Sequence, residues 1–375
     1  MSKNITAIPY TELQERVSSL SRVSENTKEK VRGVIQDVYT REIALKFDWD
    51  FLIASSSLIT IAEHKLGTVS VNTGDTALTF SSDAALTAAM TGRKIKLSGN
   101  DVVYTFTRTA TTSGTISPDF NGSSNATSVS YSIFQPVYPL SSDFDRFPST
   151  VDDDSRGGGL YRWQGGQKIG IPLEDYIESV ENYTSAPSIP SRIKMVGANT
   201  LGVQQIEFRP APRDARVYNY DYIKELKPLK ETSAGTVSIT ANATGVTGNT
   251  ACRFTEATTG DYLRIDAFGV GQDSTWHRIV AIANDSSCTL QSAFANSGVV
   301  STNYVISSAP EMPSKLHPAI LYGSIRALTL DQTDENFLVY HMRFAEVLTD
   351  AKRIHVTRVY SKKVTGDHED YQYRR

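Results

Sequence analysis

The chain has 375 residues, which corresponds to two or three domains of about 150 residues, enough to bury a core without disulfides or metals. Its 38 Lys and Arg residues and 41 Asp and Glu residues give a net charge of −3, which excludes a strongly basic nucleic-acid-binding protein. The two cysteines, Cys252 and Cys288, exclude a disulfide framework and a cysteine-rich zinc module. A polar start and the lack of any apolar run of about 18 residues predict a soluble protein without a membrane span.

The first 65 residues are predicted to form helices. Apolar residues recur at helical spacing from residue 10 to about 23 and again from 27 to 47. Thr27 or Asn26 can cap the second segment, which carries Glu29 in its first turn. Charged residues fill the other positions of both segments, so we expect two helices with one buried face each.

The middle of the chain is rich in Ser, Thr, Gly and Asn and contains an internal duplication, with copies at residues 66–135 and 235–311. The copies begin alike at Gly67 and Gly235. Further paired positions are Phe80 and Phe254, Tyr104 and Trp276, Phe120 and Phe294, and Tyr131 and Tyr304. Period-2 alternation between turn residues predicts that each copy is a small antiparallel β-sandwich or barrel. Neither copy gathers enough aromatic or acidic residues to favour a carbohydrate or metal site over a spacer or wall module.

A strand-rich connector is expected at residues 136–234, between the two copies. It contains an acidic, glycine-rich loop at 151–159, which lacks the ligand spacing of a calcium loop. Further on, one strand places Tyr218, Tyr220 and Tyr222 on the same face. Such a row is typical of a half-buried sheet surface, and it is also our candidate for a subunit contact.

Two more helices are predicted at residues 312–354. Pro318 suits the first turn of the first helix, and apolar residues from Phe337 to Leu348 continue at helical spacing in the second. Hairpins at both ends of the chain predict a four-helix core formed by residues 1–65 and 312–354. The predicted fold class is therefore α+β, with a discontinuous four-helix core, two related antiparallel β insertions and an extended C-terminal arm.

The arm, residues 355–375, has a distinctive composition. From Lys352 to Arg375 there are seven Lys or Arg residues and three acidic residues, 7 − 3 = +4, with three tyrosines between them. The arm is either a disordered tail or a segment that becomes ordered on a partner by strand addition, with its aromatic residues as anchors.

No pattern of catalytic or ligand-binding residues is found. The chain lacks a phosphate-binding glycine loop, a nucleophile elbow and a zinc-binding histidine pair, and its six histidines are scattered. A glycosidase pair among the many carboxylates stays open, because one sequence does not show which of them meet. The prediction is a protein that is not an enzyme and has no cofactor or metal.

Several motifs resemble the head-to-tail adaptor proteins of tailed bacteriophages, of the tail-tubular-A type. They are the helical hairpin that ends in Phe-Asp-Trp-Asp-Phe-Leu at 47–52, the turn at 138–144, the Phe-Arg-Pro-Ala-Pro block at 208–212 with the following Tyr-Asn-Tyr at 218–220, and the closing helices at 317–352. Together they cover most of the chain in order. The resemblance implies a structural protein of the virion, located at the head–tail junction and assembled in the host bacterial cytoplasm.

The same resemblance implies partners. It predicts a homo-oligomeric ring of about twelve copies beneath the portal protein, which extends the DNA channel and docks tail nozzle, tubular or fibre proteins. Double-stranded DNA would pass through this ring during ejection without sequence-specific binding, which suits the small negative charge. The candidate portal contacts are Val356, Arg358, Tyr360, Lys362, Lys363, Tyr371, Tyr373, Arg374 and Arg375.

The sequence also suits two other classes of protein. The β copies and tyrosine-rich strands fit a tail-fibre or glycan-binding protein of the virion, although the amphipathic helices at both ends argue against it. A hydrolase of the cell envelope rests only on the unassigned carboxylates.

Overall fold

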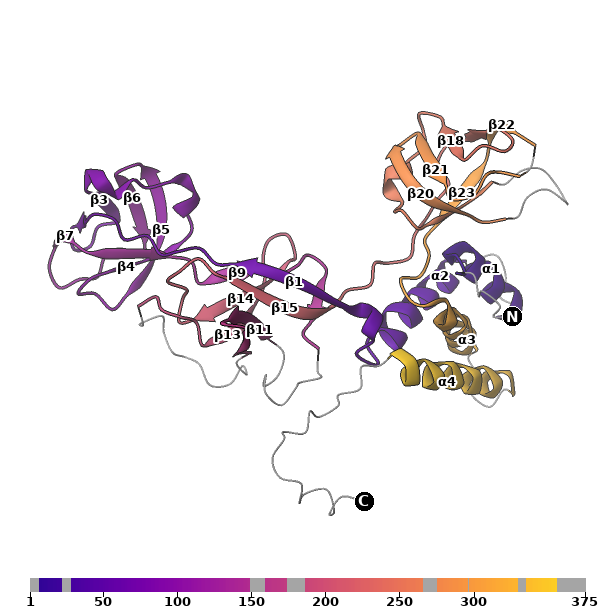
Figure 1. Ribbon diagram of the computed structural model, residues 1–375, viewed down its shortest axis with the longest axis horizontal. Coiled ribbons are helices and arrows are strands. Elements are labelled where there is room, and N and C mark those ends of the chain that lie inside the picture. Colours follow the sequence, from indigo (N-terminus) through magenta and orange to yellow (C-terminus); the bar gives the residue numbers. More distant parts are fainter. Residues whose placement is uncertain are drawn as a thin grey trace, which may run out of the picture. The chain divides into compact units, whose positions relative to one another are not determined.

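The computed structural model describes residues 7–21, 28–148, 159–173, 186–265, 275–295, 297–329 and 335–355 (Figure 1). These residues divide into two compact units. Unit 1 contains the described residues of 1–52 and 226–357, and unit 2 contains those of 53–225. Unit 1 is therefore built from both ends of the sequence, while unit 2 is one continuous segment.

The predicted fold class is wrong. Strands account for 38% of the structure and helices for 24%, with several antiparallel sheets, so the fold is not a four-helix core with insertions. Nine of the twelve largest fully buried side chains lie between residues 104 and 304, among the strands. The amphipathic periodicity at the chain ends is real, but most of the apolar surface that folding buries belongs to the period-2 segments between them.

Four α-helices lie in unit 1. They are α1 (Tyr10–Ser21), α2 (Lys28–Asp37), α3 (His317–Leu328) and α4 (Glu335–His355). α3 contacts the other three and is buried along most of its length. α2 does not continue as an α-helix to Phe47, because a wider π-helical turn replaces it at Val38–Ile43. α4 ends with Lys352, Arg353 and His355 in its last turn, where positive charge stabilises a helix C-terminus.

The first β module belongs to unit 2. Its strands are β2 (Val69–Val71), β3 (Ala77–Phe80), β4 (Lys94–Leu97), β5 (Val103–Ala110), β6 (Ser113–Ser117), β7 (Ala126–Val129) and β8 (Tyr131–Phe134), in the spatial order β7-β2-β3-β6-β5-β4-β8. Buried residues alternate with partly exposed ones, so one face of the sheet forms the apolar core. β7 and β8 lie at opposite ends of the sheet, yet only Ser130 separates them in the chain. The sheet therefore curls until its two ends meet.

The second β module belongs to unit 1. Its strands are β16 (Glu231–Thr232), β17 (Val237–Ile239), β18 (Gly245–Gly248), β19 (Tyr262–Ile265), β20 (His277–Asn284), β21 (Ser287–Leu290), β22 (Val299–Thr302) and β23 (Tyr304–Ser307). Their order is β16-β23-β19-β20-β21-β18-β17-β22, which is the order of the first module read from its other end, with β16 added. The two modules thus share one topology.

Details of the two modules also correspond. Tyr131 and Tyr304 each donate a hydrogen bond of 2.6 Å from the hydroxyl group to a main-chain oxygen shortly before β2 or β17, on Leu66 and Ala234 respectively. One paired position shifts by a residue. Tyr104 faces Ile95 across β4 and β5, and the residue in the same place in the second module is His277, which faces Leu263, rather than Trp276.

The rest of unit 2 consists of two sheets around a shared core. One sheet contains β1 (Ile53–Ile59), β15 (Val217–Lys224), β11 (Gly159–Gln164) and β12 (Gln167–Pro172) in that order, with β10 (Phe144–Arg146) also paired to β15. The other contains β13 (Arg192–Ala198), β14 (Gln204–Arg209) and β9 (Val137–Pro139). β1 falls within the segment 1–65 that was expected to be helical. Its full register with β15, from Ile53 opposite Ile223 to Ile59 opposite Val217, places it in unit 2.

Candidate interaction surfaces

The tyrosine row on β15 lies in the core of unit 2. Tyr218, Tyr220 and Tyr222 are 0%, 2% and 4% exposed and pack among the apolar residues between the two sheets. Their side chains are therefore covered by the chain itself and are not presented for a subunit contact. The period-2 pattern identified the shared face correctly, but it does not distinguish a core face from a contact surface.

Two of these tyrosines fix the turn before β10. The Ser141 amide donates to the Tyr220 hydroxyl at 2.8 Å, and the Tyr222 hydroxyl donates to Asp143 Oδ1 at 2.7 Å. Partial burial raises the pKa of Asp143, but hydrogen bonds from Ser141 and Tyr222 outweigh it and hold the pKa below its usual value. This turn carries one of the motifs behind the adaptor resemblance, and its polar groups have a structural role.

The nine candidate portal contacts, from Val356 to Arg375, lie outside the described residues. The point where this segment begins is described, at the end of α4. His355 Nδ1 lies 3.2 Å from Asp50 Oδ1, and the His355 ring meets the edge of Phe51 with centroids 5.9 Å apart. The Lys352 ammonium lies 4.7 Å from the ring centroid of Phe47. Residues 47–51 therefore hold the last turn of α4.

The aromatic residues of that segment support one another. Trp49 is fully buried and donates from Nε1 to the main-chain oxygen of Ile43 at 2.8 Å. Its ring packs against the edge of Phe47 at 5.2 Å and is stacked with Phe51 at 5.6 Å. This Phe-Asp-Trp-Asp-Phe motif therefore forms a rigid base for whatever follows His355.

A polar network joins α1 and α2 to the second β module. Glu231 on β16 accepts hydrogen bonds from Thr11 Oγ1 at 2.9 Å and Gln14 Nε2 at 3.0 Å, and it pairs with Arg32. The residue at the equivalent place in the first module is Glu63, since the next residues pair alike, Thr232 with Ile306 and His64 with Ile133. In the described structure the Glu63 carboxylate contacts two groups of unit 2, the Ser132 hydroxyl at 2.9 Å and the Lys65 ammonium at 3.0 Å. One module thus uses this position to bind helices, which single-sequence patterns did not reveal.

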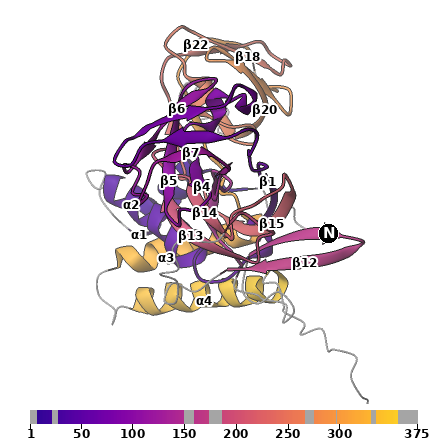
Figure 2. The same ribbon diagram turned by 90° about the vertical axis from the view of Figure 1, so that its left-hand side faces the viewer.

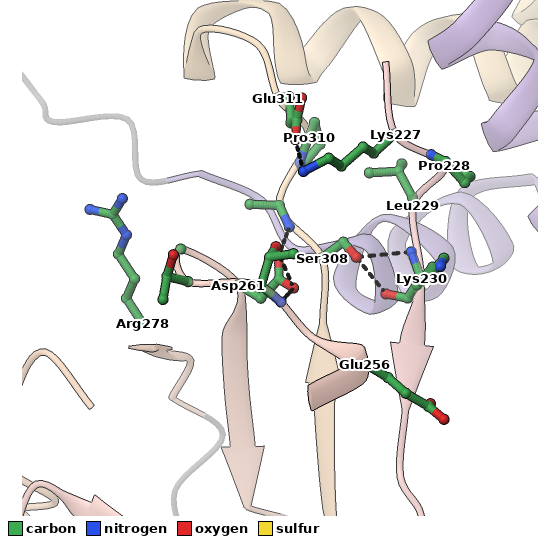
Figure 3. A pocket seen from close by; sticks show the side chains of 14 residues that line it. Lys227, Pro228, Leu229, Lys230, Glu256, Asp261, Arg278, Ser308, Pro310 and Glu311 are labelled. Atoms are coloured by element: carbon green, nitrogen blue, oxygen red, sulfur yellow. Dashed lines mark hydrogen bonds and ion pairs between the residues drawn. The ribbon is translucent and has the colours of Figure 1, made fainter. Parts of the chain in front are cut away.

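A cavity of about 300 Å³ lies beside the second module in unit 1 (Figure 3). Asp261 closes one side, where its carboxylate accepts hydrogen bonds from the amide and hydroxyl of Thr258. On the other side Lys227 lies 3.9 Å from Glu311, and Figure 3 shows the Arg278 guanidinium apart from that pair. The charged groups lining the cavity thus do not converge on one point, and the cavity has no arrangement of acid, base or nucleophile.

In the described part of the chain, no group of three or more His, Cys, Asp or Glu residues is placed to hold a metal ion. Cys252 and Cys288 are both buried and not bonded to each other, and burial raises the pKa of Cys288 to about 12. A thiol with such a pKa is protonated and unreactive at neutral pH. No described helix is long and apolar enough to cross a membrane.

One exposed feature was not singled out from the sequence. Trp163 on β11 is 63% exposed, near the turn of the β11–β12 hairpin. The signal was present in the sequence as Tyr-Arg-Trp-Gln-Gly-Gly-Gln-Lys at 161–168, an aromatic and basic segment around a glycine turn without an acidic residue.

Comparisons with known proteins give little. No family model and no curated protein matches the chain. Among solved structures, the apo form of translation elongation factor SelB from Methanococcus maripaludis aligns at 10% identity and a TM-score of 0.15. The alignment covers 66% of this chain and 63% of the SelB chain, so this protein spans less than two thirds of its length.

Proposed function

We propose that this chain is a structural head-to-tail connector of a bacteriophage virion. In this role it forms a ring under the portal, extends the DNA channel and docks tail components. The proposal rests first on the order of the adaptor-like motifs along the sequence.

The observation that supports it most is the packed base at the end of α4. The motif at residues 47–52, which is part of the resemblance, packs against the last turn of α4, some 300 residues later in the chain. A segment that reaches a partner needs a rigid point of departure, because an ordered base reduces the entropy lost when the segment binds. The basic, tyrosine-containing residues 356–375 follow directly from this point.

The two β modules suit a wall or docking surface. Each carries its own apolar core and is therefore stable as a compact body. Their surfaces are dominated by short polar side chains, which fits the role of padding or docking between proteins.

Removal of the C-terminal segment tests the portal contact. A variant that ends at His355 keeps every described contact of α4, so it should unfold at the same temperature as the full chain. Its affinity for the portal protein encoded in the same genome should fall about ten-fold or more, which corresponds to the loss of 1.4 kcal/mol or more of binding free energy. A variant with Lys362, Lys363, Arg374 and Arg375 changed to Gln separates charge from the tyrosine anchors. Unchanged portal affinity of the truncated chain would show that the contact lies elsewhere.

A further inference from the structure

The β11–β12 hairpin extends beyond the sheet to which it belongs (Figure 2). β11 joins its neighbour β15 through a single pair, Tyr161 opposite Asn219, whereas β11 and β12 pair with each other over their full length. Residues 162–168, around the turn, therefore form a two-stranded ribbon in which the described strands pair only with each other. Such a ribbon is marginally stable by itself in water, and a partner that covers it would stabilise it.

The two faces of this ribbon follow from its register. Opposite residues share a face, so Trp163 and its partner Lys168 lie on the same face as Tyr161. The Lys168 ammonium lies 4.0 Å from the centroid of the Tyr161 ring, and the Trp163 ring meets Tyr161 edge-on at 6.4 Å. Arg162 is on the opposite face. Each face therefore carries one cation, and one of them also carries an exposed indole.

Among the described residues, no carboxylate forms an ion pair with the two cations of the ribbon. Residues 159–173 include Arg162 and Lys168 but no Asp or Glu. Two acidic residues lie near the base of the ribbon. Asp221 acts electrostatically on Tyr161 and accepts a hydrogen bond from the Ser55 hydroxyl, and Asp214 is shared by Arg213 at 3.6 Å and Arg216 at 3.2 Å. Among these described groups, cations therefore outnumber carboxylates by four to two.

A buried hydroxyl group without a partner lies beside Arg162. Tyr218 is fully buried and its hydroxyl has no hydrogen-bond partner in the described structure, while Arg162, Arg216 and Asp214 act on it electrostatically. Because the chain covers this hydroxyl, it is not a contact for an outside ligand, and the partner expected for it is a buried water molecule.

We propose that the β11–β12 ribbon is a contact for the phosphate backbone of duplex DNA. A two-stranded ribbon fits the major groove, with cations on both faces able to reach phosphates, while Trp163 contacts the groove wall. Two to four phosphate contacts make the binding weak and strongly dependent on salt, with a slope of log K against log[salt] of about −2 to −4. This deepens the proposed function, in which DNA passes through the assembly, since weak contacts guide DNA without holding it.

Fluorescence anisotropy with a labelled 30-base-pair duplex tests the proposal on the full chain. We expect binding at 50 mM salt that weakens with the slope given above. The double change Arg162→Gln and Lys168→Gln should lower the affinity about ten-fold or more and reduce the slope by about 2. The matched control, Lys28→Gln and Lys30→Gln, removes two exposed cations of α2 and the same net charge, and should leave the affinity unchanged.

Three results would overturn the assignment. The first is that the chain does not bind the duplex at 50 mM salt, and the second is that both double variants lose affinity equally. The third is that polyglutamate competes as effectively as unlabelled duplex, which would indicate an acidic protein partner. Circular dichroism and thermal unfolding of the Arg162→Gln, Lys168→Gln variant check that the chain is folded. The mass of the assembly, measured separately, distinguishes the two proposals. A ring that does not bind DNA would contradict only the ribbon contact, and a monomer that binds DNA would contradict only the connector function.

Discussion

His317 joins the N-terminal segment to α3, and we expect this contact to depend on pH. The Ile8 amide donates to His317 Nδ1 at 2.9 Å, and His317 Nε2 lies 3.2 Å from the main-chain oxygen of Met312. The ring is 1% exposed. Since Nδ1 accepts a proton donor, the proton must be on Nε2, and the imidazole is neutral. Protonation of Nδ1 would place its N–H against the N–H of Ile8 and break this hydrogen bond.

The direction of the pH effect follows from the pKa. Burial lowers the pKa of His317 below its usual 6.5, although the main-chain oxygens of Met312 and Pro310 oppose this. Among the described residues, no charged side chain contributes to this shift. The stabilisation is therefore complete above pH 6.5 and is lost as the pH falls below 6.5, by up to about 1.4 kcal/mol per pH unit until the folded-state pKa is reached.

The change His317→Phe isolates the contact. It keeps an aromatic ring but leaves two buried groups unpaired, the Ile8 N–H and the Met312 C=O. Each unpaired group costs about 1–3 kcal/mol, and the lower cost of burying phenylalanine offsets part of this, so we expect a loss of about 2–4 kcal/mol in the free energy of unfolding of unit 1. His341→Phe, at an exposed position of α4, is the matched control and should have little effect.

Hydrogen–deuterium exchange measured by mass spectrometry reads this contact locally. Corrected for the intrinsic pH dependence of exchange, the peptide covering residues 7–21 should lose protection between pH 7 and pH 5.5 in the natural chain, and should already lack it at pH 7 in His317→Phe. Peptides from unit 2 report separately on His64, whose pKa burial and Arg93 also lower. Equal protection of residues 7–21 in both chains at pH 7 would show that His317 does not hold this segment.

Three further predictions concern stability and reactivity. Glu231→Gln should lower the free energy of unfolding, measured by urea titration, by about 1–2 kcal/mol, a value reduced to allow for the partial exposure of Arg32. Glu63→Gln should cost less, and an equal loss in both variants would contradict the network in unit 1. Gly33→Ala should raise the free energy of unfolding by about 0.5–1 kcal/mol, because Gly33 is inside α2 and an added Cβ would meet nothing within 4 Å; a lower melting temperature would speak against this. With Cys252 changed to Ser, Cys288 should stay unlabelled by a thiol reagent at pH 7.5 until the chain is unfolded, and rapid labelling of the folded chain would be inconsistent with its burial.

The sequence indicated local structure better than it indicated the balance between elements. Alternation at residues 69–71 and 237–239, with the tyrosines at 131 and 304, was sufficient to pair the two modules, because a strand that buries one face leaves a period of two. The prediction of a core made of four helices was wrong. Amphipathic periodicity shows that a helix has a buried face, but it does not show how much of the whole core that helix forms. The strand β1 was missed because Ile-Ala-Ser-Ser-Ser-Leu-Ile alternates weakly and is held by its pairing with β15, far along the chain.

The candidate sites show the same limit. A tyrosine every second residue on β15 predicts a common face, but only the second sheet, with Phe208 and Ile206, determines that the face is internal. The segment around Trp163 has a composition similar to that of many segments whose aromatic residues are buried. Its exposure depends on the hairpin continuing past β15, a long-range property that the segment itself does not encode.

The mass of the assembled particle tests the connector most directly. Native mass spectrometry of the full chain, alone and mixed with the portal protein from the same genome, measures how many copies associate. We expect a closed ring of about twelve copies that binds the portal, with a mass that is a multiple of the 41.2 kDa subunit mass. A chain that stays monomeric in both samples would contradict it.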